Sequence, residues 1–318
     1  MKKFISFVLF AILVFALSVT AFASNIIASG YCGGEGDGTN LEWTLDSDGV
    51  LIISGEGEMG NFSDIADKPW YVYYGRIKTL ILEDGITTIG NNAFSNCGNL
   101  SGKLMIPNSV TYIGYNAFLD CDDLEGELVI PDSVTYIGGC AFEYCDFSSI
   151  KFGNGLETIG AYAFLFCFDV KGEILIPRSV TSIEAGAFSD CSANEYYFYG
   201  DAPLGVVGVG KGGITFDADD TIYYPEGNDT WEIVSGKWNG YTAVPWEVPF
   251  ETGDINQDRK IDVKDVYPAR LVAAKLVVPT EEELSLGDVD GDGKITAIDA
   301  NLIRKFAAGI IDNFPVEV

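Results

Sequence analysis

Apolar positions between residues 77 and 200 recur with a nearly constant period. An isoleucine, followed by glycine in four of the five copies, precedes an Ala-Phe pair and then a cysteine. The copies span 89–97, 113–121, 137–145, 159–167 and 183–191. Between the copies lie short β-branched segments, such as KLMIPNSV and ELVIPDSV, which are interrupted by Pro or Gly. Steps of 22 to 24 residues are typical of leucine-rich repeats, whose coils share one continuous core.

The apolar side chains of each coil are expected to divide into inward and outward sets. The strand positions expected to face inward are Leu104, Ile106, Leu128, Ile130, Ile150, Phe152, Ile174 and Ile176. The phenylalanine of each copy is expected to fill the opposite wall. The outward positions are Ile81, Met105, Val129, Lys151, Leu175 and Tyr197. Such a mildly apolar stripe either marks a binding face or reflects strand propensity alone.

The string IPDSVTYIGGCAFEYC (130–145) resembles the BspA-like branch of leucine-rich repeats, as do the flanks at 40–59, 198–203 and 221–231. This resemblance implies a solenoid with a parallel β-sheet on one face and short helical or irregular turns. The expected boundaries are an N-terminal cap at 24–76, five repeats at 77–200 and a C-terminal cap at 201–245.

Five of the seven cysteines occupy one repeat position. Equivalent side chains of stacked coils point in parallel, whereas a disulfide needs converging Cβ vectors. A ladder of buried thiols acting as small hydrophobes is therefore expected. Cys32 and Cys140 have no assigned role.

Charge and composition exclude several functions. The chain has 19 basic and 47 acidic residues, a balance that repels nucleic-acid phosphates and anionic lipids. It contains no histidine, which removes Ser-His-Asp and Cys-His catalysis and His-ligated zinc.

The first 23 residues read as a signal peptide. Lys2 and Lys3 precede an apolar run, and Ala21 and Ala23 form a cleavage motif before Ser24. The alternative is an uncleaved anchor helix. We expect a secreted, extracellular protein without a membrane span after cleavage.

Two acidic loops begin at Asp254 and Asp288 in the same register. Ca²⁺ requires six to eight oxygens, which such loops supply at positions 1, 3, 5, 9 and 12 and through the backbone carbonyl at position 7. In the first loop these are Asp254, Asn256, Asp258, Lys260, Asp262 and Asp265; in the second they are Asp288, Asp290, Asp292, Lys294, Thr296 and Asp299. The spacing predicts two Ca²⁺ ions. The second loop has Gly293 at position 6, where the first has Arg259.

Each loop is followed by a helical pattern, and prolines exclude a helix before the first loop. Residues 253–312 therefore resemble a type I dockerin, an all-α module expected over 253–318 after a linker at 246–252. The resemblance implies a cohesin partner on a scaffoldin of a cellulosome or on a bacterial surface. Its partner positions map to Ala297, Ile298, Arg304 and Lys305 in the second copy and to Val263, Lys264 and Arg270 in the first. Because Pro268 falls inside the first helix, the second copy is the expected binding face.

No segment outside the repeats and their caps is long enough for a catalytic domain. The sequence therefore favours a non-catalytic binding or adhesion protein, tethered through cohesin, whose repeat domain contacts an unknown protein or surface ligand. One alternative is a carbohydrate-binding accessory of a polysaccharide-degrading complex, with Trp231, Trp238, Tyr241 and Trp246 as a stacking platform. Those aromatic residues are also suited to closing the end of the solenoid. A dockerin-bearing hydrolase is the less favoured alternative.

Overall fold

A computed structural model describes residues 25–248, 263–275, 278–279, 281–291 and 293–307. The chain forms two compact units, Met1–Trp246 and Glu247–Val318, here called the repeat unit and the helical unit. The expected signal peptide lies outside the described residues. Among the helices that are described, none has the length and apolar character needed to span a membrane.

A β-hairpin cap begins the repeat unit. Strands β1 (Ile26–Tyr31), β2 (Leu41–Asp46) and β3 (Val50–Gly55) pair antiparallel, and β3 then pairs in parallel with β5 (Thr79–Leu82). Two 3-10 helices, η1 (Ile65–Asp67) and η2 (Tyr71–Arg76), lie between β3 and β5. The cap thus presents to the first coil a strand edge that is already parallel to it.

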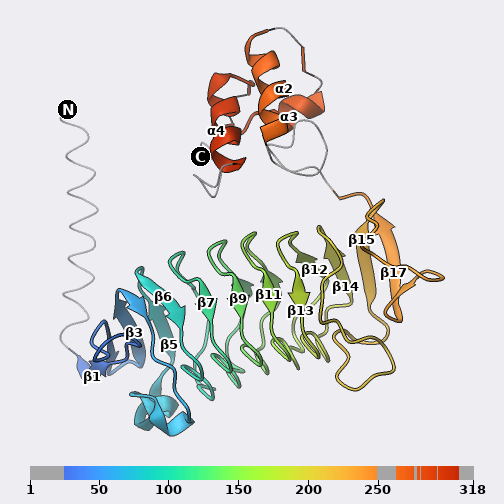
Figure 1. Cartoon of the computed structure of the whole chain (residues 1–318). Helices are drawn as coiled ribbons and strands as arrows, with labels where there is room; N and C mark the ends of the chain where they lie inside the picture. The colour runs from blue at the N-terminus through green and yellow to red at the C-terminus, as the bar shows by residue number, and fades with distance from the viewer. Residues whose placement is uncertain (1–24, 249–262, 276–277, 280, 292, 308–318) are drawn as a thin grey trace, which may run out of the picture. The chain divides into compact units, whose positions relative to one another are not determined.

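The coils stack side by side and build parallel sheets along their length (Figure 1). One face carries β8 (Glu127–Val129), β10 (Ser149–Lys151), β12 (Glu173–Ile176), β14 (Glu195–Phe198), β15 (Thr221–Pro225), β16 (Lys237–Trp238) and β17 (Tyr241–Trp246). Only β16 in this set pairs antiparallel. The segment 103–106 keeps Leu104 and Ile106 buried but forms no strand.

A second parallel sheet lies beside the turns, which are irregular rather than helical. It consists of β4 (Gly57–Glu58), β6 (Ile86–Ile89), β7 (Tyr112–Ile113), β9 (Tyr136–Ile137), β11 (Thr158–Ile159) and β13 (Ser182–Ile183). Residues 77–200, which are all described, contain no helix. The fold class is therefore confirmed, with irregular turns, and the structure adds the second sheet.

The core is a ladder of phenylalanine rings. Phe94, Phe118, Phe142, Phe164 and Phe188 are fully buried, with successive ring centroids 5.2 to 5.4 Å apart and nearly parallel planes. The eight strand residues expected to face inward are all buried, as predicted. Each ring therefore shields its neighbours from water, which makes the stack of coils more stable than any one coil.

The repeated cysteines are buried and unbridged, as expected. The Cys121 thiol donates to the Phe94 carbonyl, and Cys145 and Cys167 donate likewise to the carbonyls of Phe118 and Phe142, each at 3.2 Å. Burial is the main cause that raises the pKa of the Cys97 thiol to about 11. These side chains therefore fill space and satisfy carbonyls rather than react.

A third set of contacts between coils runs through the turns. The amides of Asn92, Phe94 and Asn96 donate to carbonyls of the next coil at 2.8, 2.8 and 2.6 Å. Asn92 and Asn96 have positive φ, and the same two positions have positive φ in the following coils. Every coil thus places two residues in a backbone conformation that Asn, Asp and Gly tolerate best.

Aromatic residues close the far end of the repeat unit. Trp231, Trp238 and Tyr241 are buried, and the rings of Trp231 and Trp238 lie 4.6 Å apart. Trp246, expected to open the linker, is instead the last residue of β17 and pairs with Pro225. Three of the four aromatics therefore close the core, which corrects the idea of a stacking platform for sugars at this site.

The helical unit contains α2 (Val263–Ala273), α3 (Glu281–Gly287) and α4 (Ala297–Ala307). Its small core consists of Val266, Ala269, Val289, Ile295, Ala300 and Ile303. Helix α2 continues through Pro268 to Ala273, although proline removes one helical hydrogen bond.

Candidate calcium centre and partner face

The second acidic loop connects α3 to α4 and is anchored by its apolar residues. Val289 and Ile295 are buried in the core of the helical unit, one on each side of the loop. The amide of Asp288 donates to the Leu284 carbonyl at 3.1 Å, which joins the loop to the last turn of α3. The described residues of the loop, from Asp288 to Asp299, are thereby held on one short arc.

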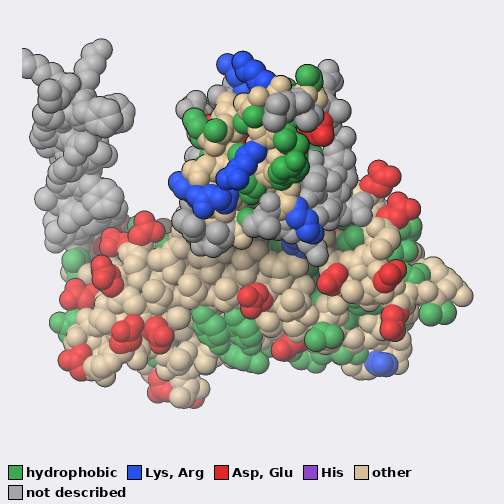
Figure 2. Space-filling model, turned by 45° about the horizontal axis from the view of Figure 1, so that its top comes forward, with side chains coloured by type: hydrophobic (Ala, Val, Ile, Leu, Met, Phe, Trp, Pro, Cys, Tyr) green, Lys and Arg blue, Asp and Glu red, His purple; other side chains and the backbone are tan. Residues whose placement is uncertain are grey.

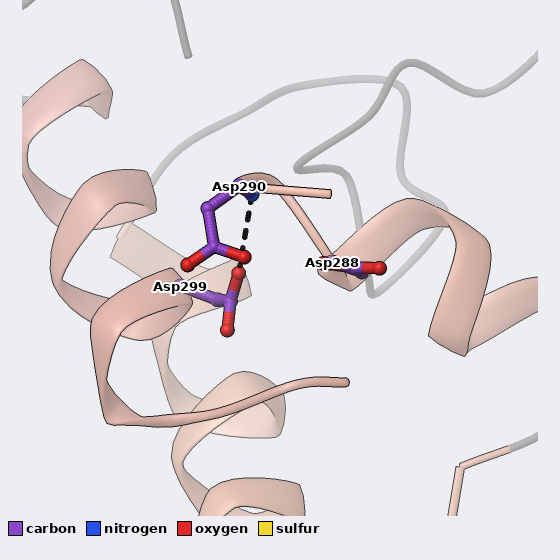
Figure 3. A group of neighbouring side chains, drawn as sticks. All are labelled: Asp288, Asp290 and Asp299. Carbon is purple, nitrogen blue, oxygen red and sulfur yellow. Dashed lines mark hydrogen bonds between the residues drawn. The ribbon is translucent and has the colours of Figure 1, made fainter. Parts of the chain in front are cut away.

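Three carboxylates converge on this arc. One oxygen from each of Asp288, Asp290 and Asp299 lies within 4.8 Å of the others, although the residues are up to eleven positions apart (Figure 3). Asp299 is fully buried, while Asp288 and Asp290 are half-buried. A buried carboxylate facing two others is costly unless a cation neutralises it.

Backbone amides fix the orientation of these carboxylates. Asp288 accepts from the amides of Gly291 and Gly293 at 3.0 and 2.7 Å. Asp299 accepts from the amides of Val289 and Asp290 at 3.0 and 3.4 Å. The loop therefore wraps around its own carboxylates, an arrangement that preorganises oxygen ligands.

Glycine at position 6 is required by backbone conformation rather than by space. Gly293 has a φ of +82°, and a Cβ placed there would meet no atom within 4 Å. The sharp turn at this position favours glycine because other residues are strained at such a φ.

Asp299 also caps the start of helix α4. Its carboxylate accepts from the Thr296 amide and hydroxyl, and the Thr296 hydroxyl in turn accepts from the Ile298 amide at 3.1 Å. This is a helix cap of the Thr-x-x-Asp type, with an acid in the first turn of α4. Sequence reasoning assigned Thr296 and Asp299 to calcium alone and missed the cap, although the spacing of three residues is visible.

The described ligands fit a hard cation. Three carboxylates at one centre match the oxygen preference of Ca²⁺, and no histidine or cysteine lies among them. Asp292 and residues 254–262 of the first loop lie outside the described residues, as do the side chains of Val263 and Asp265. The ligand roles of those residues, of the Lys294 carbonyl and of Thr296 stay predictions.

Several predicted partner residues are accessible at the start of α4. Ile298 is 60% exposed, a large fraction for an aliphatic side chain, and Ala297 beside it is exposed. Arg304, nearly two turns further on, donates to the Asn301 side chain at 2.8 Å. Figure 2 shows Lys and Arg side chains on the helical unit, whereas Asp and Glu prevail on the visible face of the repeat unit.

The structure groups the partner residues differently from the sequence. A pocket of about 350 Å³ is lined by Arg270 and Ala273 of α2, by Ala274 just after this helix, and by Ala297, Ala300 and Asn301 of α4. The end of α2 therefore lies against the start of α4, so that the two helices run antiparallel. Arg270, assigned by sequence to the first copy, shares this pocket with Ala297 of the second copy.

Comparison with known proteins identifies both parts of the chain. Residues 70–194 match the family model of the BspA type leucine rich repeat region in six copies, one more than the cysteine pattern suggests. Residues 252–308 match the model of the dockerin type I domain. Among the curated proteins, none matches the chain.

Solved structures of bacterial leucine-rich repeat proteins are also similar. One from Eubacterium ventriosum is 21% identical, with 69% of this chain and 68% of that chain covered and a TM-score of 0.35. The T. pallidum leucine rich repeat protein is 24% identical, with coverage of 59% and 80% and a TM-score of 0.38. A leucine rich cell surface protein from Faecalibacterium prausnitzii is 18% identical, with coverage of 61% and 65% and a TM-score of 0.33.

Proposed function

Because the chain carries a BspA-type leucine-rich repeat region followed by a type I dockerin domain, we propose that it is a secreted, non-catalytic binding protein. A type I dockerin domain binds calcium and docks to a cohesin. In the proposed arrangement the dockerin attaches the repeat region to a cohesin of a cellulosome or cell-surface scaffold. The repeat region is the part that selects a further ligand.

We propose that the dockerin holds two Ca²⁺ ions, one per loop. The convergence of Asp288, Asp290 and Asp299 supports the second site directly. The first loop has the same residue types in the same register, so the same chemistry is expected there. Each ion stabilises the folded helical unit because the unfolded chain has no preformed site.

The observation that carries the docking proposal is the position of Ile298. This exposed aliphatic residue lies one position before Asp299, the buried carboxylate of the calcium centre. Calcium binding therefore fixes the start of α4 and with it the apolar residue presented to a partner. Arg270 at the neighbouring pocket adds a charged contact of the kind that gives interfaces their specificity.

The repeat region is expected to bind its ligand on the outer face of the sheet. Leu175, Tyr197, Tyr223 and Val244 lie in one register across four strands, and the rings of Tyr197 and Tyr223 stack at 4.1 Å. Met105 continues the exposed apolar character of this face. Such a patch on a repeat protein favours a protein or surface ligand.

The docking proposal is tested by calorimetric titration of the full chain with a type I cohesin. Binding is expected in calcium and is expected to be lost in a chelator. Ile298→Asp and Arg270→Glu should each weaken binding at least about tenfold, as interface residues near the centre of a patch do. Ser285→Ala, an exposed position of α3, is the matched control. Wild-type affinity in both variants would show that another face docks.

The function of the repeat region requires a separate measurement. A pull-down with the full chain should compare insoluble polysaccharides with bacterial and host surface proteins. The proposal is supported if wild type enriches a protein and if Leu175→Asp and Tyr197→Ser each abolish this enrichment. Retention on polysaccharide, or hydrolysis of it, would favour the accessory or hydrolase alternatives instead.

A further inference from the structure

A second surface of the repeat unit lies on its turns, away from the outward strand positions. The residue before each repeated cysteine has positive φ in every coil. In three coils this position holds Asn96, Asp120 or Asp190, which suit such a φ. In the two coils between them it holds Tyr144 and Phe166, with φ of +58° and +60°. Two bulky residues thus occupy a strained backbone conformation for which the equivalent turns use Asn or Asp.

These rings contribute nothing to the core. Tyr144 is 40% exposed and the adjacent Phe168 is 53% exposed, and neither belongs to the buried cluster of the repeat unit. Ring centroids of Tyr144 and Phe166 lie 4.7 Å apart, and those of Phe166 and Phe168 lie 5.6 Å apart. We call Tyr144, Phe166 and Phe168 the turn patch. Strain and exposed aromatic area together point to a role outside folding.

Carboxylates are frequent on the turns that carry the turn patch. The same turns contribute Asp120, Asp122, Asp123, Glu143, Asp146 and Asp169, none of which is buried. The pKa of Asp146 is raised by partial burial and then by the charges of Asp169, Asp122 and Asp123, so these groups are close enough to repel one another. Within the described residues, one ion pair reaches these carboxylates, between Asp169 and Lys171 at 3.5 Å.

The chemistry of the turn patch selects the class of occupant. Exposed aromatic faces attract cations, arginine more often than lysine, and carboxylates on the same turns can add charge-assisted hydrogen bonds. Anionic ligands are repelled, and a neutral sugar would leave the carboxylate repulsion in place. We propose that the turn patch docks a protein partner through an arginine-rich segment, in addition to the sheet-face ligand proposed above.

The test uses the calcium-loaded full chain and a labelled peptide of alternating arginine and glycine. Binding is measured by fluorescence anisotropy at several salt concentrations. Tyr144→Asn combined with Phe166→Asn removes the rings and installs the residue type that equivalent turns already use. This variant should melt no earlier than wild type, because the strain is relieved, yet bind the peptide at least about tenfold more weakly.

Matched controls separate the turn patch from the overall negative charge. Asp229→Asn with Glu232→Gln removes two exposed charges of the C-terminal cap and should leave peptide affinity within about twofold of wild type. Asp122→Asn with Asp146→Asn should weaken it. A glutamate-containing counterpart peptide should not bind. The proposal is overturned if wild type does not bind the arginine peptide, or if the ring variant binds it normally. It is also overturned if the cap control loses as much affinity, or if a cello-oligosaccharide binds instead.

Discussion

The carboxylate of Asp299 accepts two hydrogen bonds from Thr296, one from its amide at 2.7 Å and one from its hydroxyl at 3.0 Å. The same carboxylate lies in the cluster with Asp288 and Asp290. One buried side chain therefore caps helix α4 and belongs to the candidate calcium centre. We therefore expect folding of that helix and metal binding to be coupled through this residue.

Replacing Asp299 with Asn keeps the shape of the side chain but removes its charge. The charged acceptor contributes about 1.5–3 kcal/mol in hydrogen bonds alone, so calcium affinity at the second site should fall on the order of tenfold to a hundredfold. Isothermal titration of the full chain with calcium should lose or weaken one of its binding steps. Ser285→Ala should titrate as wild type does. An unchanged titration of Asp299→Asn would remove this residue from the ligand set.

Chelation should act on the helical unit alone. Ligand binding to the folded form adds about 2.7 kcal/mol when the free ion is a hundredfold above its dissociation constant, and the small core of this unit offers little else. Scanning calorimetry in calcium and in a chelator should show one transition lost or shifted to lower temperature and the repeat transition unmoved. Adding calcium back should restore the transition of the helical unit. An equal shift of both transitions would mean that the metal stabilises the whole chain.

Cys140 occupies a turn position with a φ of +54°, where the two preceding coils have Asn92 and Asn116. Those two side chains bond to each other at 2.9 Å. Cys140→Asn should therefore relieve backbone strain and extend this row, with a gain of about 0.5–1 kcal/mol and a rise of about 2–4 °C in the repeat transition. Cys140→Ala, which tolerates positive φ no better than cysteine, should not gain. The explanation by backbone strain is wrong if Cys140→Ala and Cys140→Asn shift the repeat transition equally.

Asp220 gives the repeat unit a pH dependence. Burial raises the pKa of this carboxyl from 3.8 to about 7, the charges of Asp217 and Asp219 add to the rise, and a hydrogen bond from the Asp217 backbone opposes it. The folded state therefore holds the proton more tightly than the unfolded state. The resulting stability is fully present below pH 3.8 and is lost as pH rises through about 7.

The melting temperature of the repeat unit should accordingly fall between pH 5 and pH 8. Asp220→Asn keeps an acceptor for the Asp217 amide without the charge, so it should flatten this profile and stabilise the unit mainly at pH 8. Asp229→Asn removes one exposed charge that is not among the causes of the Asp220 pKa shift and serves as the control. If both variants flatten the profile equally, general charge repulsion rather than Asp220 sets the dependence.

The core and the calcium loop were predictable because each depends on local spacing. A coil that repeats every 22 to 24 residues places equivalent apolar side chains at equivalent depth, and Phe94 and Phe118 are buried as that spacing requires. Likewise, alternate oxygen-bearing residues followed by an acid at position 12 bring Asp288, Asp290 and Asp299 together. Neither inference needed knowledge of distant contacts.

The second sheet was not predictable in the same way. Each of its strands in the repeats after β6, such as Tyr112–Ile113, has only two residues, too few to show the alternation of a strand. Hydrogen bonds between coils supply the pairing, and close approach of the backbones requires glycine: a Cβ on Gly138 would lie 2.6 Å from the Tyr115 amide nitrogen.

The sequence by itself determined the stacked-coil fold, its buried residues and the ligand register of the second loop, since these follow from periods within one segment. Tertiary structure alone decided that Arg270 lies beside Ala297, and that Tyr144 and Phe166 stack on an exposed turn. The physical reason is that antiparallel helix packing and the stacking of successive coils bring together residues that no local spacing connects.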